Sequence, residues 1–354
     1  MSEVRADRLA QVLAERELDS LLVSDLTNVR WLTGFTGTNG AAVVTADRRL
    51  FLTDFRYTEQ AEEQVTGFER LPAGRDLVGD LAAHLTGRAG FDDVHVSVRT
   101  HGTLADKVGE GVELVPAGGA VESLREVKDR DELGRIAASQ ELASAALERI
   151  LERGLVGRSE REVALDLEQE MRLAGAAGPS FPSIIAAGSH GALPHAVPRD
   201  QAIPAGVLVV IDWGAILDGY CSDCTRTVAT GVLSDDAAEA YDLVRRAQQT
   251  GLEAVRAGVR GADVDAAARE VIEAAGLGER FGHSLGHGVG LEVHEGPTLS
   301  KRSESELAPG NVVSVEPGVY LPGRFGIRIE DLVAVTADGA DVFTRLSKEL
   351  LLTD

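Results

Sequence analysis

The sequence has few cysteines, few basic residues relative to acidic ones, and no long apolar run. Its two cysteines, Cys221 and Cys224, are too few for a disulfide framework, so a reducing cytoplasm is the expected compartment. The charged N-terminal stretch lacks the apolar core of a signal peptide, and no other run has the length of a membrane span. Lysine and arginine number 35 against 57 acidic residues, and the net charge of -22 disfavours nucleic acid and anionic membranes as partners.

The length of 354 residues predicts two domains. In residues 1–125, short apolar runs alternate with helical patterns, which indicates a layered α/β domain. Strands are expected at SLLVS, AAVVTAD and RLFLTD, and helices around 5–17, 57–65 and 76–86. The segment SLREVKDRDELGRIAASQELASAALERILERG has spaced Leu, Ile and Ala among charged residues, which predicts one long amphipathic helix across the boundary.

The second predicted domain comprises residues 126–354. Helical patterns at 159–174, 235–256 and 262–275 accompany four strand-like runs, VLVVIDWGAI, GYCSDCTRTVATG, NVVSVEPGVYL and GIRIEDLVAVT. Hairpin-like pairs among these runs imply an antiparallel sheet with helices on one side, which is an α+β domain.

A predicted hairpin brings two aspartates together. Asp212 and Asp223 flank a turn at Asp218-Gly219. Two pairing registers are plausible, and both put the two side chains on one face of the sheet, either opposite or diagonal to each other.

Two glutamates are related in the same way. Glu316 and Glu330 are equally far from Gly323 in the loop LPGRFG, and strand alternation puts Arg328 and Glu330 on one face with Asp331 on the other. Four converging acids would repel one another unless cations neutralised them. Any single acid is better explained as a solvated residue, so the expectation of bound metal depends on their conjunction.

A glycine-rich segment supplies three of the eight histidines. His283, His287 and His294 lie in FGHSLGHGVGLEVHEGP, whose glycines disfavour regular structure and allow the backbone to bend close to a site. A lone histidine is usually structural or exposed, but three so close together indicate a function.

These motifs together resemble the creatinase and aminopeptidase P family of pita-bread metallopeptidases, which includes prolidase. The resemblance rests on IDWGAILDGYCSDCTRT, HSLGHGVGLEVHE, SVEPGVY and GIRIED in the second domain and on NVRWLTGFTGTNGAAVV in the first. It implies a creatinase-type N-terminal domain at 1–125, a pita-bread catalytic domain at 126–354 and a site with two divalent metal ions. The ligands that it implies are Asp212, Asp223, His287, Glu316 and Glu330. Of these, Asp223 and Glu330 would bridge the two ions.

The donor set agrees with this implication. Four carboxylates and one imidazole suit Mn or Co better than a thiolate zinc site would, and Zn is also possible. Two such ions activate a bridging water and polarise a peptide carbonyl, and Glu316 would act as the general base. His195 and His294 resemble the family's histidines that are not ligands, which stabilise the tetrahedral intermediate and position substrate or proton.

Two arginines are further substrate-binding candidates. Arg328 would hold a site acid by charge-assisted bonds, or is a plain surface residue. Arg302 resembles an arginine of prolidase-like relatives that meets the free carboxylate of a dipeptide, although Lys301, Glu304 and Glu306 around it are also typical of a solvated loop.

The resemblance implies an exopeptidase that hydrolyses the Xaa-Pro bond of dipeptides or of peptide N-termini. Its partner would be a small peptide with proline at the second position, and its assembly a homodimer. The alternatives are a methionine aminopeptidase-like enzyme, a dipeptidase of broader specificity, and a non-catalytic peptide-binding pseudo-enzyme. The extra N-terminal domain argues against the first, and the presence of all five ligand residues argues against the last.

Overall fold

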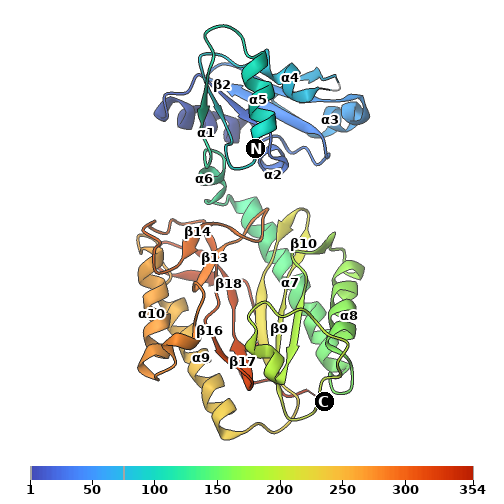
Figure 1. Cartoon of the computed structure of the whole chain (residues 1–354), viewed down its shortest axis with the longest axis vertical. Helices are drawn as coiled ribbons and strands as arrows, with labels where there is room; N and C mark the ends of the chain where they lie inside the picture. The colour runs from blue at the N-terminus through green and yellow to red at the C-terminus, as the bar shows by residue number, and fades with distance from the viewer. Residues whose placement is uncertain (1, 75, 354) are drawn as a thin grey trace. The chain divides into compact units, whose positions relative to one another are not determined.

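The computed structural model describes residues 2–74 and 76–353, and it divides into two compact units, Met1–Arg125 and Glu126–Asp354. Figure 1 shows the first unit in blue to green and the second in green to red. Each unit has its own sheets, helices and buried apolar core. Within the described ranges, no helix combines the length and the apolar character needed to cross a membrane.

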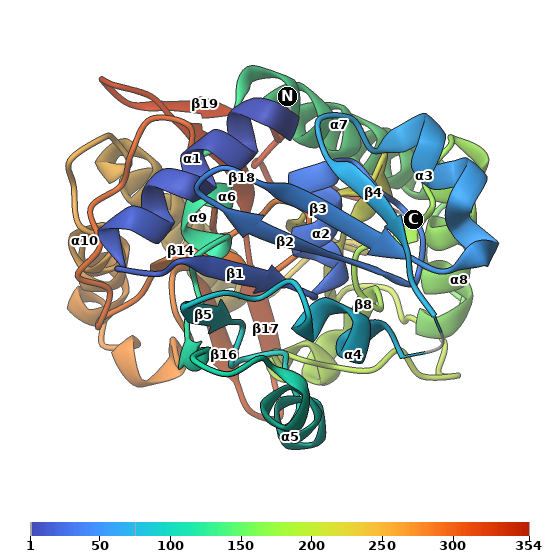
Figure 2. The same ribbon diagram turned by 90° about the horizontal axis from the view of Figure 1, so that it is seen from above.

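A six-stranded mixed sheet lies in the middle of the N-terminal unit. Its strands are β1 (Ser20–Val23), β2 (Gly40–Thr45), β3 (Arg49–Thr53), β4 (Glu69–Pro72), β5 (Arg88–Phe91) and β6 (Glu113–Pro116). Their order is β4-β3-β2-β1-β5-β6, and Figure 2 shows the first five side by side. The pairs β1-β2 and β2-β3 are antiparallel, whereas β1-β5, β3-β4 and β5-β6 are parallel.

Helices cover both faces of this sheet. They are α1 (Ser2–Glu15), α2 (Leu26–Thr33), α3 (Thr58–Gln64), α4 (Leu77–Ala82), α5 (Val98–Lys107) and α6 (Glu122–Arg125), with a 3-10 turn η1 (Phe55–Tyr57). Ala41 and Val43 of β2 pack in one cluster with Leu81 of α4 and Leu104 of α5. Ala42, also buried, alternates to the opposite face, where α1 and α2 contact β2. The predicted α/β class of this domain is confirmed.

The prediction of one long helix beginning at residue 123 is wrong. The chain forms α6 and then a separate α7 (Arg130–Glu152). Asp129 is the N-cap of α7, and it forms a capping box with Glu132 in which each side chain bonds the other's backbone N–H. This signal, an acid three residues before a glutamate, was present in the sequence and outweighs the continuous helical pattern.

The C-terminal unit contains four long helices and short antiparallel sheets. The other helices are α8 (Glu160–Leu173), α9 (Asp235–Ala254) and α10 (Gly261–Ala274), with the 3-10 turns η2 (Gly188–Ala192) and η3 (Gly278–Arg280). The strands are β7 (Gly178–Pro179), β8 (Ile184–Ala187), β9 (Leu208–Trp213), β10 (Ala215–Leu217), β11 (Tyr220–Cys221), β12 (Cys224–Ala229), β13 (Gly286–Gly288), β14 (Glu295–Leu299), β15 (Val312–Val315), β16 (Gly318–Leu321), β17 (Phe325–Arg328), β18 (Asp331–Val335) and β19 (Ala340–Val342).

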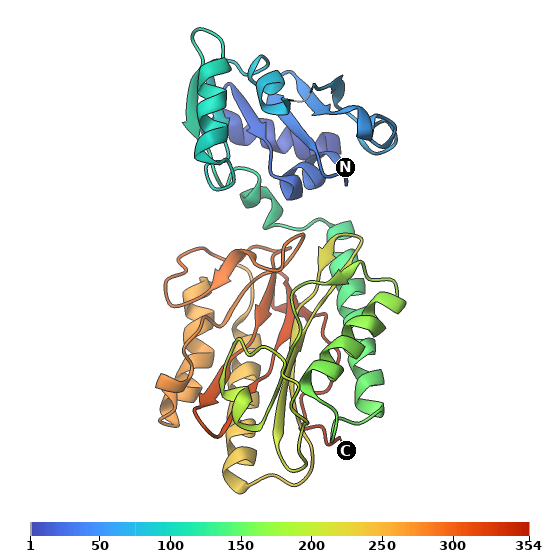
Figure 3. The same ribbon diagram turned by 45° about the vertical axis from the view of Figure 1, so that its right-hand side comes forward.

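Two apolar clusters join the helices to these strands. One packs α7 and α8 against β8, β9 and β12 around Trp213, and the other packs α9 and α10 against β15, β16 and β17 around Ile327. In Figures 1 and 3 the green helices α7 and α8 lie toward the right of this unit and the gold-to-orange helices α9 and α10 toward the left. Every ladder between named strands of this unit is antiparallel, so the predicted α+β class is confirmed.

Candidate metal centre

The first hairpin places Asp212 near the end of β9 and Asp223 just before β12. Its turn is at Asp218-Gly219, where both residues have positive φ, 49° and 83°, as a tight two-residue hairpin turn requires. The same register continues into β9 and β12, where Asp212 lies opposite Thr225. Asp223 is therefore diagonal to Asp212 on the same face, in one of the two predicted registers.

The second hairpin places Glu316 opposite Glu330. β16 and β17 pair around Gly323, and β15 and β18 continue the same register beyond the two acids. The backbone N–H groups of the acids bond outside this hairpin, because Glu316 donates to Leu285 O at 2.8 Å and Glu330 donates to Thr225 O at 3.1 Å. These bonds bring the second hairpin beside the first hairpin and beside the histidine segment.

The histidine segment reaches the acids through β13. A Cβ atom on Gly286 would lie 1.9 Å from Ser314 O, so glycine is required for β13 to approach β15 this closely. His287 follows it, and its Nε2 lies 3.3 Å from Glu316 Oε1 and 3.5 Å from Asp223 Oδ2. Asp223, His287 and Glu330 form a cluster in which one potential ligand atom of each residue lies within 4.8 Å of those of the other two.

The carboxylate charges in this cluster repel one another. Burial raises the pKa of Asp223 well above its usual range, and the charges of Glu330 and Asp212 raise it further. Burial and the charges of Glu316 and Asp212 likewise raise the pKa of Glu330 well above its usual range. Burial acts in the same direction on Glu316, but its hydrogen bond with His287 and nearby positive charges outweigh burial and lower its pKa to about 2.

Two buried carboxylate oxygens of the site also lack a partner. Asp212 Oδ1 and Glu330 Oε1 have no hydrogen-bond donor among the described residues. Buried polar atoms are nearly always bonded, and an unpaired buried charge is costly. Divalent cations bound to these two oxygens would take the place of hydrogen-bond donors and would offset the repulsion among the acids. The residues present therefore fit a site for such cations, with oxygen donors and one imidazole.

Comparison with known proteins identifies the family. A profile described as metallopeptidase family M24 matches residues 134–337, and one described as the creatinase/prolidase N-terminal domain matches residues 5–127. The chain belongs to metallopeptidase family M24. It is thus an enzyme of a class that uses divalent metal ions, and the predicted pita-bread fold and creatinase-type N-terminal domain are confirmed.

Several relatives of this M24 peptidase match it over nearly their whole length. The uncharacterized peptidase YqhT of Bacillus subtilis is 42% identical over 99% of this chain and 100% of its own. The solved Xaa-Pro dipeptidase from Bacillus anthracis is 38% identical, with a TM-score of 0.97 over 99% of this chain and 100% of that chain. The X-Pro aminopeptidase from Thermotoga maritima is 35% identical, with a TM-score of 0.89 over 96% of this chain and 99% of that chain.

Of the two candidate histidines, His294 lies beside His287. The rings of His287 and His294 have centroids 4.3 Å apart and are tilted by 59°. Partial burial and then the charge of His287 lower the pKa of His294, and His195 adds to this effect. His195 and His294 are both exposed.

The two candidate arginines lie in different environments. Arg328 is buried, and its Nη2 donates to Asp212 Oδ2 at 2.5 Å. Its Nη1 donates to Tyr320 Oη at 2.7 Å and to Pro194 O at 3.3 Å. Arg302, in contrast, is exposed and makes no hydrogen bond or ion pair with any described residue.

Sequence reasoning missed Tyr320 as part of this M24 site. Its hydroxyl also meets His283 Nε2 at 3.0 Å, so it links that histidine to Arg328. Alternation along β16 puts Tyr320 on the face of Glu316, and this alternation was the available signal. A Cβ atom on Gly318 would lie 2.6 Å from the Tyr320 hydroxyl, so glycine leaves room for the ring.

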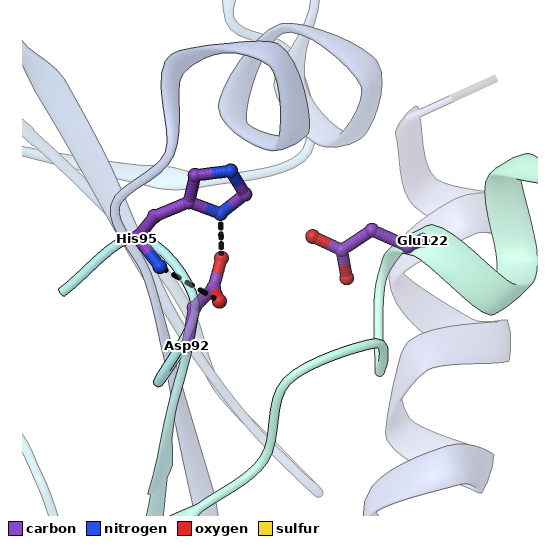
Figure 4. Close-up of side chains that lie close together, drawn as sticks. All are labelled: Asp92, His95 and Glu122. Carbon is purple, nitrogen blue, oxygen red and sulfur yellow. Dashed lines mark hydrogen bonds and ion pairs between the residues drawn. The ribbon is translucent and has the colours of Figure 1, made fainter. Parts of the chain in front are cut away.

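A second cluster of metal-ligand residue types lies in the N-terminal unit. Asp92, His95 and Glu122 also have ligand atoms within 4.8 Å of one another. Figure 4 shows Asp92 bonded to His95, while the Glu122 carboxylate approaches from α6 without a bond to either. Asn28 Nδ2 donates to Glu122 Oε1 at 2.6 Å. Both acids of this cluster therefore already have protein partners.

Proposed function

We propose that this chain is a dinuclear metal-dependent exopeptidase that hydrolyses the Xaa-Pro bond of dipeptides or of peptide N-termini. The observation that carries the proposal is the convergence of two acidic hairpins and His287 around carboxylate oxygens that lack partners. The substrate class is supported by the Xaa-Pro dipeptidase and X-Pro aminopeptidase that share its fold over nearly the whole chain. The match of the N-terminal unit to a creatinase/prolidase domain disfavours a methionine aminopeptidase.

Five side chains would hold the two ions. They are Asp212, Asp223, His287, Glu316 and Glu330, a set in which oxygen donors predominate and which favours Mn or Co over a thiolate zinc site. When bound, the ions supply a water of lowered pKa and polarise the peptide carbonyl. Asp223 and Glu330, whose pKa values burial and mutual repulsion raise, are the acids that gain most from positive charge.

Glu316 would move the proton of the reaction. Its carboxylate is ionised in the folded chain and would accept the proton of the attacking water once the ions lower the pKa of that water. As the C–N bond breaks, Glu316 returns this proton to the leaving nitrogen. Ser314 Oγ donates to Glu316 Oε1 at 3.0 Å and orients the carboxylate.

His195, His294 and Arg328 would have the remaining roles in binding and catalysis. Partial burial and the neighbouring histidines lower the pKa of His294, so its neutral ring can donate an N–H to the oxygen that becomes negative in the transition state. His195, which is also exposed, would position the substrate. Arg328 is buried against Asp212, so we assign it the role of orienting this acid.

A substrate panel tests the proposal. Ala-Pro, Ala-Pro-Ala and Ala-Ala would be incubated with the purified protein and added Mn or Co. Hydrolysis of the proline peptides well above Ala-Ala is expected, and the ratio of Ala-Pro to Ala-Pro-Ala distinguishes a dipeptidase from an aminopeptidase. Equal rates on Ala-Ala would favour the broader dipeptidase, and no hydrolysis in metal-loaded protein would favour a peptide-binding pseudo-enzyme.

A homodimer is proposed from the family resemblance alone. Static light scattering at working concentration is expected to give twice the mass of one chain. The mass of a single chain would contradict it.

A further inference from the structure

A buried carboxylate joins the two ends of the loop that carries His195. Glu160 is the first residue of α8, and only 1% of it is exposed. The loop begins at Ala187, the last residue of β8, passes through η2, and reaches Arg199 after His195. Between η2 and β9, the described chain forms no helix or strand apart from an isolated bridge at Ala202. Tertiary bonds must therefore hold His195 in place.

Glu160 bonds both ends of this loop. At the first end, Ala187 N donates to Oε1 at 2.9 Å, and His190 Nδ1 lies 2.9 Å from Oε2. At the other end, Arg199 donates three times, from its backbone N at 3.0 Å, from Nε at 3.1 Å and from Nη2 at 3.0 Å. One side chain thus closes a loop that has little internal structure of its own.

The ionised form of Glu160 is the one that fits these donors. Burial would raise its pKa, but the bonds from Arg199, Ala187 and His190 outweigh burial and lower it. An ionised carboxylate only accepts, so His190 Nδ1 must carry a proton here. A glutamine at this position would instead turn an NH₂ group toward donors and leave some of them without an acceptor.

The middle of the loop is hydrogen-bonded to an arginine of the metal site. Pro194 O accepts from Arg328 Nη1 at 3.3 Å, and the same guanidinium bonds Asp212. His195 follows Pro194 directly, and the turn bond from Ala196 N to Leu193 O at 3.2 Å spans it, so its position depends on these local bonds and on the two ends that Glu160 joins.

We propose that Glu160 is a positioning residue for His195. Its carboxylate fixes the span of the loop, so that the exposed imidazole of His195 remains at the substrate. The inference rests on the proposed function, which gives His195 its contact with the substrate. Glu160 itself touches no candidate ligand or substrate-binding side chain among the described contacts, and acts through the loop alone.

A double-mutant cycle tests this inference. The parent protein, Glu160→Gln, His195→Ala and the double variant would be compared by kcat/KM on Ala-Pro with saturating Mn, with metal content measured on each. Glu160→Gln is expected to lower kcat/KM on the order of 10- to 100-fold in the parent, the scale of a misplaced substrate-binding group. In the His195→Ala background it should lower kcat/KM less than about twofold, because the group that it positions is already absent.

Glu170→Gln is the matched control. Glu170 lies on the same helix α8 and accepts from Arg149 and Arg153, so it too is a carboxylate held by arginines, but none of its bonds reaches the His195 loop. Its loss should leave kcat/KM within about twofold of the parent in both backgrounds. If Glu160→Gln does not fold, Arg199→Ala takes its place in the cycle, because that side chain is 42% exposed and releases one end of the loop only.

The outcomes separate the inference from the function on which it rests. Equal losses from Glu160→Gln, or from its replacement, in both backgrounds would overturn the positioning role while leaving the role of His195 intact. Parent-like activity of His195→Ala would overturn the proposed role of His195 and the inference with it. A loss confined to the parent background supports the inference.

Discussion

Two clusters in this chain each combine acids with a histidine, but they differ in how many of their carboxylate oxygens are already hydrogen-bonded. In the N-terminal unit, Asp92 accepts from two backbone N–H groups of its own turn and from His95, and Glu122 accepts from Asn28. In the C-terminal unit, one oxygen each of Asp212 and Glu330 accepts no hydrogen bond from a described residue.

The difference shows why proximity alone does not define a metal site. The N-terminal acids are satisfied by neutral donors and by a histidine whose side chain is 40% exposed, so water screens what charge remains. The C-terminal acids are buried together, and burial and repulsion raise the pKa of Asp223 and of Glu330. An uncompensated buried charge, and not the count of ligand atoms, is what a cation would relieve.

Metal removal should have the largest effect. Chelation is expected to abolish hydrolysis of Ala-Pro, and added Mn or Co should restore it, because the proposed water loses its activation without the ions. Metal analysis should find two ions per chain, and the double variant Asp92→Asn/Glu122→Gln should retain both. Full activity in protein shown to be metal-free would refute the mechanism.

The general base gives the next largest effect. Glu316→Gln is expected to lower kcat by about 10²- to 10⁴-fold with little change in KM, because an amide cannot accept the proton of the water. Bound metal is measured in the same samples. A variant that keeps its ions and turns over at nearly the parent rate would exclude Glu316 as the base.

Asp223→Asn tests the electrostatic contrast directly through stability. The raised pKa of Asp223 means that its ionisation destabilises the metal-free fold once the pH exceeds the ordinary value of 3.8. At pH 7 the substitution should therefore stabilise metal-free protein, by up to about 1.4 kcal/mol for each pH unit above 3.8. With Mn bound, the sign should reverse, because the parent gains the free energy of metal binding and the variant loses part of it.

Asp92→Asn is the matched control for this sign reversal. It removes an acceptor of existing hydrogen bonds, so it should destabilise the protein by about 1–3 kcal/mol with or without Mn. Denaturant titrations of the full chain, with and without metal, give both comparisons. The same sign for Asp223→Asn under both conditions would mean that repulsion does not govern the C-terminal cluster.

Two arginines provide a contrast of the same kind. Arg328 is buried and bonded, whereas Arg302 is exposed without a protein partner among the described residues. A free guanidinium is available to meet the carboxylate of a dipeptide, so Arg302→Ala should weaken Ala-Pro hydrolysis by about 1–3 kcal/mol and affect Ala-Pro-Ala less. Equal losses on the two substrates, or none, would leave Arg302 as a surface residue.

Much of the site was predictable because its geometry is local. Asp218-Gly219 and Gly323 fix the two hairpin registers, and strand alternation then sets which acids share a face. The links made by Glu160 were not predictable in this way. Glu160 joins residues far away along the chain, so only the folded structure shows that its partners lie at the two ends of one loop.

The smallest effect is expected from the N-terminal cluster itself. The hydrogen bond with Asp92 raises the pKa of His95, and the charges of Asp92, Asp25 and Glu122 act in the same direction against partial burial. A raised pKa means that the pair stabilises the fold below the ordinary histidine pKa of about 6.5 and loses this contribution as the pH rises through the folded value. His95→Gln should therefore destabilise the protein at pH 5.5 by less than about 1 kcal/mol, because the histidine side chain is 40% exposed, and by less still at pH 9.

Tryptophan fluorescence can measure this small effect of His95→Gln on stability. The protein has two tryptophans, and Trp31 lies in the N-terminal unit while Trp213 lies in the C-terminal one, so Trp213→Phe leaves Trp31 as a reporter of the unit that contains His95. Denaturant unfolding of Trp213→Phe with and without His95→Gln, at both pH values and with and without Mn, gives the comparison. If the effect of His95→Gln grows when Mn is added, and one ion per chain is lost with it, then the N-terminal cluster binds metal despite its satisfied acids. Partner-free oxygens would then be the wrong criterion for separating the two clusters.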